Sequence, residues 1–314
     1  MKRLLILTAV LVSMVSAQAT VLRVNNIEGI DAPYKTIDAA LLDAVSGDTI
    51  MVEGSPTSYG TITIEKSITM IGSGYWQVKN GIMAEGANAT FTNNVIVKVP
   101  NVTIHGIDMG YLYLYDDNCV VTRCKLSGIY YNVEKDGSTI VKSSDNSVIS
   151  QCVIRGKITV YGGTSNRTSG HQITNNIFNG DTQVENPTAE IIQLDNSYIA
   201  YNTFRGKLAF GSCSATSVEY NLWSEEPSSS SSNSVGTNQI HNFGKLLTKD
   251  STDKDFYEHE GTLDLRDTFG AFAGDNPYVI SGIPTGPVIT DIEMPTTVEK
   301  GSKLNVTLKV AVSK

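Results

Sequence analysis

Short segments in the middle of the chain share one pattern of apolar and polar positions. Five of them superpose: NCVVTRCKLSG (118–128), NSVISQCVIRG (146–156), GHQITNNIFNG (170–180), NSYIAYNTFRG (196–206) and ATSVEYNLWS (215–224). A further segment, NVTIHGIDMG (101–110), fits more loosely. Each has an apolar anchor, and these anchors are Ile104, Val121, Ile149, Ile173, Ile199 and Val218. A regular local pattern at irregular spacing is typical of stacked repeats that differ in loop length.

Two more positions recur after each anchor. Three residues after it stand Ile107, Cys124, Cys152, Asn176, Asn202 and Asn221. Two residues further on stand Met109, Leu126, Ile154, Phe178, Phe204 and Trp223. The anchor and this last position have opposite parity, so one straight strand cannot point both side chains into a core. We therefore predict a bend near the Asn or Cys, and an internal ladder of stacked side chains formed by Cys124, Cys152, Asn176, Asn202 and Asn221.

Other elements are expected on both sides of the repeats. Residues 34–47 predict a helix with Thr36 as N-cap and Gly47 as its end, because Ile37, Ala40, Leu41 and Ala44 form one apolar face. Short strands are predicted over 49–53 and 61–64. Near the end, apolar residues alternate with polar ones at Leu304, Val306, Leu308, Val310 and Val312. This strand can pair with residues 288–294, and such a pair is marginal alone, so we expect it to dock on the repeats or on another chain.

The repeat pattern resembles the right-handed parallel β-helix of the pectin-lyase-like superfamily, which has an asparagine ladder at the short turn between its second and third sheets. The segment YKTIDAALLDAVSGDTIMV (34–52) resembles the N-terminal helical cap and first strand of that superfamily. The segment GAFAGDNPYVISGIPTGPVITDIEMP (270–295) is similar to the tail of secreted β-helix proteins from Bacteroidetes-type bacteria. The resemblance implies an all-β fold, a right-handed parallel β-helix solenoid with an N-terminal α-helical cap and a short C-terminal β tail.

Three parts of the chain are predicted. Residues 1–19 have the basic start, short apolar run and Ala17-Gln18-Ala19 site of a secretory signal peptide. Residues 20–285 are assigned to the parallel β-helix, with an irregular Ser-rich excursion over 225–260, and residues 286–314 to the β tail. The apolar run is shorter than the roughly 20 residues of a membrane span. We therefore expect a secreted, periplasmic or cell-surface protein without a membrane span.

Composition and charge exclude some classes of fold and of binding partner. The chain has 314 residues, of which 18% are charged, and a formal net charge of −8. The low charged fraction and the many turn-forming residues exclude a coiled coil, and the acidic balance argues against a nucleic-acid partner. Removing residues 1–19 deletes two basic and no acidic side chains, which leaves a charge of −10.

We expect no zinc site among the cysteines and histidines. Cys124 and Cys152 stand at the same position of neighbouring repeats, about 4.8 Å apart if the strands are paired. This spacing allows a disulfide in an exported protein, but parallel side chains favour two stacked free thiols. Cys119 and Cys213 share no repeat position, and the four histidines are scattered along the chain.

One basic tripeptide occurs twice, as Arg155-Gly156-Lys157 and Arg205-Gly206-Lys207. The resemblance places this turn beside the groove that holds polysaccharide in lyases. A lyase needs a cation to neutralise a uronate carboxylate and a base to take the C5 proton, and Arg and Lys can supply both. Arg155, Lys157, Arg205 and Lys207 are therefore the candidate catalytic residues. The alternative is a solvated turn in which Asp181 lies between the lysines.

Tyrosines form the candidate ligand-binding group. In GYLYLYDDN (110–118), Leu112 and Leu114 alternate with tyrosines, and further tyrosines follow in the next two repeats. The group consists of Tyr111, Tyr113, Tyr115, Tyr130, Tyr131 and Tyr161. If the leucines face the core, these rings lie on the outer face, where aromatic rings can bind sugars. The alternative is cross-strand aromatic stacking that stabilises the sheet.

Acidic residues precede three anchors, as Asp117-Asn118, Asp145-Asn146 and Asp195-Asn196. Stacked carboxylates of Asp117 and Asp145 could hold calcium, whereas a repeated Asx-type turn is the simpler interpretation. No other metal or cofactor is expected.

The motifs of polygalacturonases, pectin methylesterases and pectate lyases are absent, so whether the protein is an enzyme stays open. We expect binding of a polysaccharide or cell-surface glycan. The alternatives are a polysaccharide lyase or glycoside hydrolase with an unrecognised active site, and a structural or adhesive module. Self-association through the C-terminal strand is a further expectation.

Overall fold

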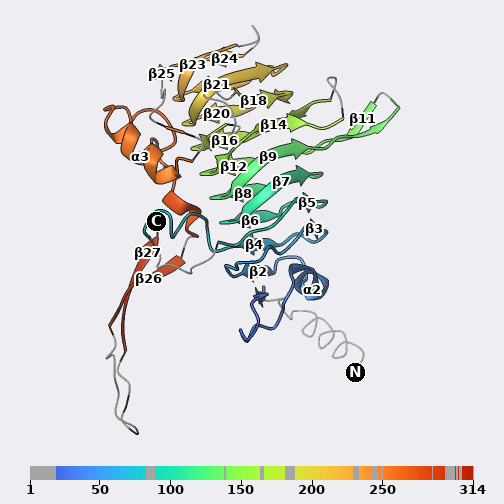
Figure 1. The fold of residues 1–314 in the computed structure, drawn as a ribbon. Coiled ribbons are helices and arrows are strands. Elements are labelled where there is room, and N and C mark those ends of the chain that lie inside the picture. Colours follow the sequence, from blue (N-terminus) through green and yellow to red (C-terminus); the bar gives the residue numbers. More distant parts are fainter. Residues whose placement is uncertain are drawn as a thin grey trace, which may run out of the picture.

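The computed structural model describes residues 19–82, 89–137, 139–162, 166–180, 188–228, 233–241, 247–248, 250–284, 286–293, 301, 303 and 306–313. The fold is predominantly β, with two large sheets of parallel strands that run side by side along the molecule (Figure 1). The predicted signal peptide lies outside the described residues except for Ala19. Within these ranges, no helix has the length and apolarity needed to cross a membrane.

The first sheet has ten strands. In spatial order they are β1 (Val21–Val24), β2 (Thr49–Val52), β4 (Thr69–Ile71), β6 (Thr103–His105), β8 (Val120–Thr122), β12 (Val148–Ser150), β16 (Gln172–Thr174), β20 (Tyr198–Ala200), β22 (Ser217–Glu219) and β24 (Ser234–Val235). The register aligns the predicted anchors from Ile104 to Val218 in one column. All of these anchors are buried, so the predicted core position is confirmed.

The second sheet has eleven strands. They are β3 (Ile62–Ile64), β5 (Val95–Val97), β7 (Asp108–Leu114), β9 (Lys125–Tyr131), β13 (Val153–Ile154), β14 (Lys157–Val160), β17 (Ile177–Phe178), β18 (Thr188–Ile192), β21 (Thr203–Gly211), β23 (Leu222–Ser228) and β25 (Gln239–Ile240). The apolar residues two places after the ladder form a second buried column, from Met109 to Trp223. Within it, the rings of Phe178 and Phe204 stack at 4.5 Å.

The bend between the two sheets lies near the Asn or Cys, as predicted. The left-handed backbone falls on the residue immediately before it. These residues are Gly106, Arg123, Gln151, Asn175, Tyr201 and Tyr220, with φ between 53° and 67°. The ladder residue must point its side chain inward to reach backbone groups, so the preceding residue takes the left-handed conformation and points outward.

The ladder itself is confirmed and is one residue longer than predicted. The backbone N–H of Asn176 donates to Oδ1 of Asn202 at 3.0 Å, and the N–H of Asn202 donates to Oδ1 of Asn221 at 2.9 Å. The N–H of Asn221 donates in turn to Oδ1 of Asn238 at 2.9 Å, a residue that the sequence pattern did not identify. Cys124 and Cys152 continue the ladder at its other end as buried free thiols, in agreement with the favoured interpretation.

Helix α2 (Ile37–Asp43) packs its apolar face against β1, β2 and β3. Thr36 is its N-cap, because its side chain accepts a hydrogen bond from the N–H of Ala39 at 3.2 Å. The helix is shorter than predicted, and Gly47 belongs to the turn that follows it, where φ is 98°.

The segment 225–260 is more regular than the predicted excursion. Strands β24 and β25 within it extend both sheets, and the helix α3 (Asp253–Gly261) forms at its end. Phe256 of α3 packs in a second apolar cluster, against Val153, Ile177 and Leu222 on the outer face of the second sheet. The outer face therefore becomes core at this place, which explains why Asp253 and Glu260 are fully buried.

The chain after α3 returns along the bend and contains the short helix η1 (Ile280–Gly282). The outward-pointing bend side chains hold it. Asn175 Nδ2 donates to the carbonyl oxygen of Ala273 at 2.8 Å, and Arg123 Nη1 donates to that of Ile283 at 2.8 Å. This segment and α3 together cover the bend between the two sheets (Figure 1).

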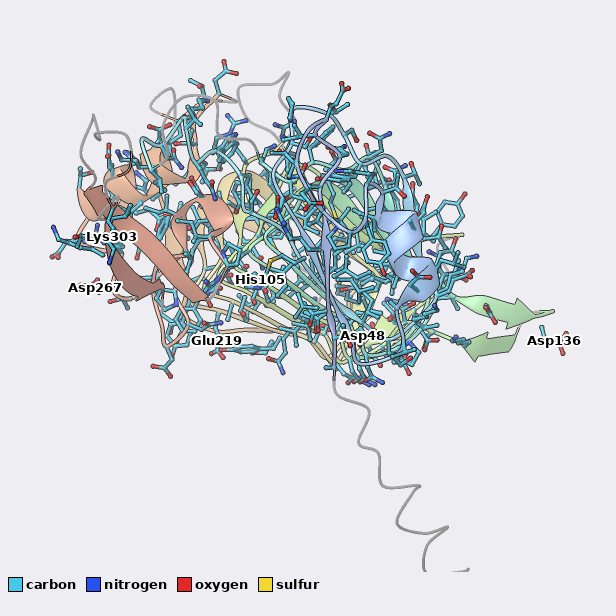
Figure 2. The ribbon with its side chains drawn as sticks, turned by 90° about the horizontal axis from the view of Figure 1, so that it is seen from below. Asp48, His105, Asp136, Glu219, Asp267 and Lys303 are labelled. Atoms are coloured by element: carbon cyan, nitrogen blue, oxygen red, sulfur yellow. The ribbon has the colours of Figure 1, made fainter. Side chains whose placement is uncertain are left out.

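Three small two-stranded sheets complete the fold. Strands β15 (Thr168–Ser169) and β19 (Leu194–Asp195) pair parallel, and β10 (Glu134–Asp136) and β11 (Thr139–Lys142) pair antiparallel. Strands β26 (Gly286–Glu293) and β27 (Thr307–Ser313) form the predicted two-stranded tail; they pair antiparallel and extend away from the large sheets (Figure 1). Figure 2 shows the hairpin around Asp136 on the opposite side of the molecule from Asp267 and Lys303.

Candidate functional site

Neighbouring strands β7 and β9 place tyrosines on one face. Leu112 and Leu114 are fully buried, as the alternation predicted, so Tyr111 and Tyr113, which alternate with them, point outward. The register sets Tyr113 opposite Tyr130, and the two rings stack with centroids 5.3 Å apart and an interplanar angle of 13°.

Two more exposed rings flank this pair. Tyr111 lies 5.6 Å from Tyr130 between ring centroids and is 41% exposed, and Tyr161 lies 6.2 Å from Tyr130 and is 60% exposed. We call Tyr111, Tyr113, Tyr130 and Tyr161 the tyrosine face. Beside Tyr111, Gly128 lets β9 approach the backbone of Lys157, because a Cβ there would come within 2.9 Å of the Lys157 carbonyl oxygen.

Tyr131 departs from the predicted group. Tyr131 was expected on the outer face but is fully buried, because it pairs with Leu114 and shares the inward parity of that residue. Its ring packs against His171 at 4.2 Å, and burial raises its pKa above the usual range for tyrosine. Tyr115 follows β7 and is half-buried.

The tyrosine face carries neutral hydroxyl groups and two charged neighbours. Partial burial and the adjacent tyrosines raise the pKa values of Tyr113 and Tyr130, so both hydroxyls keep their protons at neutral pH and can donate hydrogen bonds. Lys157 Nζ lies 5.9 Å from the centroid of the Tyr130 ring, within the range of a cation–π contact. Lys157 also stands opposite Glu190 in the register, which brings a cation and a carboxylate to the border of the face.

The two basic tripeptides do not form one group. Lys157 borders the tyrosine face, whereas Arg155 is exposed between β13 and β14 and Lys207 is exposed within β21. Arg205, expected at an exposed turn, is buried with 4% of its surface exposed. Its Nε donates to the Asn179 carbonyl oxygen at 2.7 Å, and burial lowers its pKa. Arg205 is buried because the chain leading into α3 covers it, and its Nη1 donates to the carbonyl oxygen of Leu247. Asp181, which we expected between the lysines, lies outside the described residues.

A cationic cluster beside Arg155 was not found from the sequence. Lys125 at the start of β9 is buried, forms an ion pair with Asp108, and places Nζ 5.4 Å from the centroid of the Trp76 ring. Lys79 Nζ lies 5.9 Å from the same ring. Burial lowers the pKa of Lys125 and the charges of Arg155 and Lys79 lower it further, while Asp108 opposes both effects. Trp76 comes from a loop outside the repeat, so no periodic signal pointed to it.

The candidate calcium residues accept hydrogen bonds from the backbone of the next repeat. Asp117 Oδ1 accepts the backbone N–H of Asp145 at 2.7 Å, and Asp145 Oδ1 accepts the N–H of Ser169 at 2.7 Å. Asp195 repeats this contact with Ser214 at 3.0 Å. The pattern is a ladder of hydrogen bonds from the backbone of one repeat to a carboxylate of the repeat before it, and these contacts are not the local Asx-type turns that we expected. Among the described residues, no group of three or more His, Cys, Asp or Glu is placed to hold a metal ion. Calcium binding stays a prediction.

Two histidines that we expected to be scattered lie together. Nε2 of His241, next to β25, is 3.2 Å from Nε2 of His259 on α3. This contact links the last strands of the stack to the helix.

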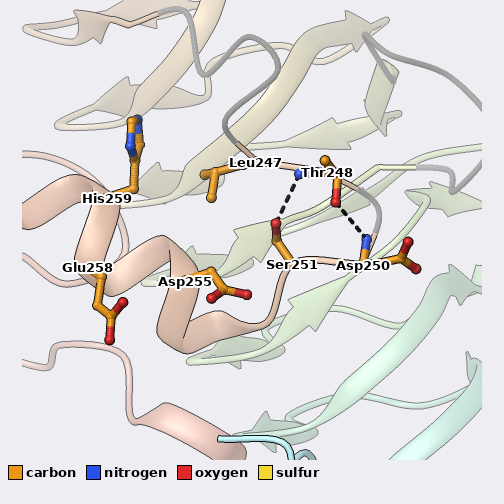
Figure 3. A pocket seen from close by; sticks show the side chains of 7 residues that line it. All are labelled: Leu247, Thr248, Asp250, Ser251, Asp255, Glu258 and His259. Carbon is orange, nitrogen blue, oxygen red and sulfur yellow. Dashed lines mark hydrogen bonds between the residues drawn. The ribbon is translucent and has the colours of Figure 1, made fainter.

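A pocket of about 460 Å³ lies beside α3 (Figure 3). It is lined by Leu247, Thr248, Asp250, Ser251, Asp255, Glu258 and His259. Asp255 closes a capping box with Thr252, and Ser251 Oγ accepts the N–H of Thr248 at 2.9 Å. These polar groups shape the start of the helix, and no candidate residue from the sequence lines the pocket.

Comparisons of the chain with protein-family models, with curated proteins and with solved structures found no match. The tyrosine face and the cationic cluster are therefore the features that indicate a function.

Proposed function

We propose that the protein is a secreted carbohydrate-binding protein that holds a polysaccharide or cell-surface glycan against the tyrosine face. The observation that carries the proposal is the stacked pair Tyr113–Tyr130 with Tyr111 and Tyr161 exposed on either side. The apolar faces of sugar rings pack against aromatic rings, and the phenol hydroxyls can bond sugar hydroxyls.

We also propose a more specific fold than two large parallel sheets. A right-handed parallel β-helix of the pectin-lyase-like type is supported by two parallel sheets in continuous register and by the amide ladder at the bend between them. In such a fold a long, shallow outer face suits an extended polymer. Export through a signal peptide over residues 1–19 is supported by the sequence pattern. Mass spectrometry of the protein from the culture medium tests it, since cleavage after Ala19 sets the new N-terminus.

Cross-strand stacking that only stabilises the sheet is the competing account of the tyrosines. The two accounts differ at the exposed rings. Tyr111 and Tyr161 add little to the core because much of each ring is in solvent, so their removal would leave the free energy of unfolding nearly unchanged. A binding role predicts a loss of glycan affinity at the same positions.

The test is a screen of the whole protein against a panel of polysaccharides, scoring retention and product formation together. We expect Tyr111→Ala and Tyr161→Ala each to weaken retention by at least about threefold. The matched control is Tyr257→Ala on α3, because Tyr257 is 38% exposed and lies outside the tyrosine face. Equal retention of Tyr111→Ala, Tyr161→Ala and wild type would overturn the proposal.

One observation favours an enzyme as the second candidate function. Lys125 has a lowered pKa and lies near Arg155, which supplies the two elements that a polysaccharide lyase needs, a base and a cation. Product formation in the same screen, abolished by Lys125→Met and kept in Lys98→Met, would establish it. Lys98 is a suitable control because it pairs with Glu65 on the surface.

A further inference from the structure

Two histidines near the last layer of the stack each bring one ring nitrogen to the same place. His241 follows β25, and His259 lies in the last turn of α3. Nε2 of His241 is 3.2 Å from Nε2 of His259, and the two ring centroids are 5.4 Å apart. Both side chains are half-buried, so solvent reaches the pair. The two residues are 18 positions apart in different elements, which is why their spacing in the sequence indicated no metal site.

The direct contact between the rings is a hydrogen bond, and it requires two different tautomers. Only a protonated ring nitrogen donates, so Nε2 of one ring carries a proton and Nε2 of the other accepts it through its lone pair. Burial lowers the pKa of both imidazoles, and the neighbouring His259 lowers that of His241 further. Both rings are therefore mainly neutral at pH 7, which is the form that binds metal ions.

The same separation of the two nitrogens suits two ligands of one metal ion. A zinc–imidazole bond is roughly 2.0–2.1 Å long, so an ion bonded to both nitrogens would see them at an angle of about 100°. Tetrahedral coordination needs roughly 109°. A small rotation of each ring therefore directs both lone pairs at one ion, and neither the strand nor the helix has to move.

The charges around the pair favour a cation. The pocket beside His259 is lined by the carboxylates of Asp250, Asp255 and Glu258 (Figure 3). Lys254 offsets one of these charges through its ion pair with Glu258 at 3.9 Å. Asp255 lies one helical turn before His259 on α3. Carboxylates gathered beside a cleft raise the local concentration of cations.

We propose that His241 and His259 bind one transition-metal ion of the zinc type through their Nε2 nitrogens, with water in the remaining positions. Imidazole suits Zn²⁺, Cu²⁺ and Ni²⁺, whereas Ca²⁺ and Mg²⁺ prefer oxygen ligands. The ion replaces one hydrogen bond with two metal–nitrogen bonds and joins β25 to α3. Because the unfolded chain does not hold the two rings together, binding stabilises the folded form.

The test is isothermal titration calorimetry of the whole protein with zinc chloride, after treatment with EDTA and buffer exchange. We expect one Zn²⁺ per chain, and we expect His241→Gln and His259→Gln each to weaken its affinity by at least about tenfold. His105→Gln is the matched control, because His105 lies on β6 against Thr122 and should not contribute to binding. Calcium chloride should not displace the zinc.

Nuclear magnetic resonance of the ring nitrogens gives a second measurement on the unmodified protein, which holds even if a variant misfolds. Without zinc, Nε2 of one ring carries a proton. With zinc, both rings should carry their proton on Nδ1, because the ion takes both Nε2 lone pairs. Absence of zinc binding, equal affinity in wild type and both variants, displacement by calcium, or tautomers that do not respond to zinc would overturn the inference.

Discussion

Replacing Glu260 with glutamine should make the protein more stable at alkaline pH and leave it unchanged in acid. The Glu260 side chain is fully buried on α3, accepts a hydrogen bond from Thr203 Oγ1 at 2.6 Å, and has its pKa raised from 4.5 to about 8. Burial is the main cause, while the hydrogen bond from Thr203 and the charge of Arg266 oppose it. The folded protein therefore holds this carboxyl in its neutral form at neutral pH.

The sign and size of the effect follow from linkage. Below pH 4.5 the carboxyl is protonated in both the folded and the unfolded chain, so it contributes no pH dependence. Between pH 4.5 and about 8 the unfolded chain ionises while the folded chain does not, and stability falls. Each pKa unit corresponds to about 1.4 kcal/mol, so the full loss is at most roughly 5 kcal/mol above pH 8.

The assay is urea unfolding followed by circular dichroism at pH 4, 6 and 8.5. Glutamine keeps the shape of the side chain and cannot ionise, so the free energy of unfolding of Glu260→Gln should exceed that of wild type by an amount that grows with pH. Glu258→Gln is the control, because Glu258 lies on the exposed face of the same helix. A difference between Glu260→Gln and wild type that stays constant from pH 4 to 8.5 would refute the reasoning.

Three further predictions use other parts of the structure. Asn202→Ala should lower the free energy of unfolding by roughly 3 kcal/mol in urea melts, because it leaves the N–H of Asn176 and the carbonyl of Ile173 buried without their partner. The four free cysteines should resist a thiol reagent until the protein is unfolded and then all react, whereas two reactive thiols would reveal a disulfide. Arg205→Met should lower the free energy of unfolding without changing glycan retention. Lys157→Met should weaken glycan retention without changing the free energy of unfolding. Equal effects of the two substitutions would contradict the different roles of the two tripeptides.

The elements that depend on local periodicity were predictable. The anchor columns, the ladder from Cys124 to Asn221, the helix after Thr36 and the paired tail strands all follow from spacing alone, since strand and helix periods act over a few residues. The alternation in β7 likewise placed Tyr111 and Tyr113 on the outer face. The columns and the ladder were found because the same spacing recurs in each repeat.

Two residues are exceptions, and each has its own cause. Tyr131 is buried because side chains in β9 alternate between the two faces up to its last residue, which places Tyr131 on the inner face beside Leu114. Asn238 was missed because the Ser-rich composition before it concealed one more layer of the stack.

By itself, the sequence determined which residues line the core and which stack as a ladder, because those choices are fixed by neighbours a few positions away. Only the tertiary structure decided which outer faces stay in solvent. The chain after β25 folds back over part of the second sheet, burying Arg205 and Glu260 there, while the tyrosine face remains open. Contacts between segments so far apart leave no periodic trace in the sequence, and they settle which polar residues can meet a ligand.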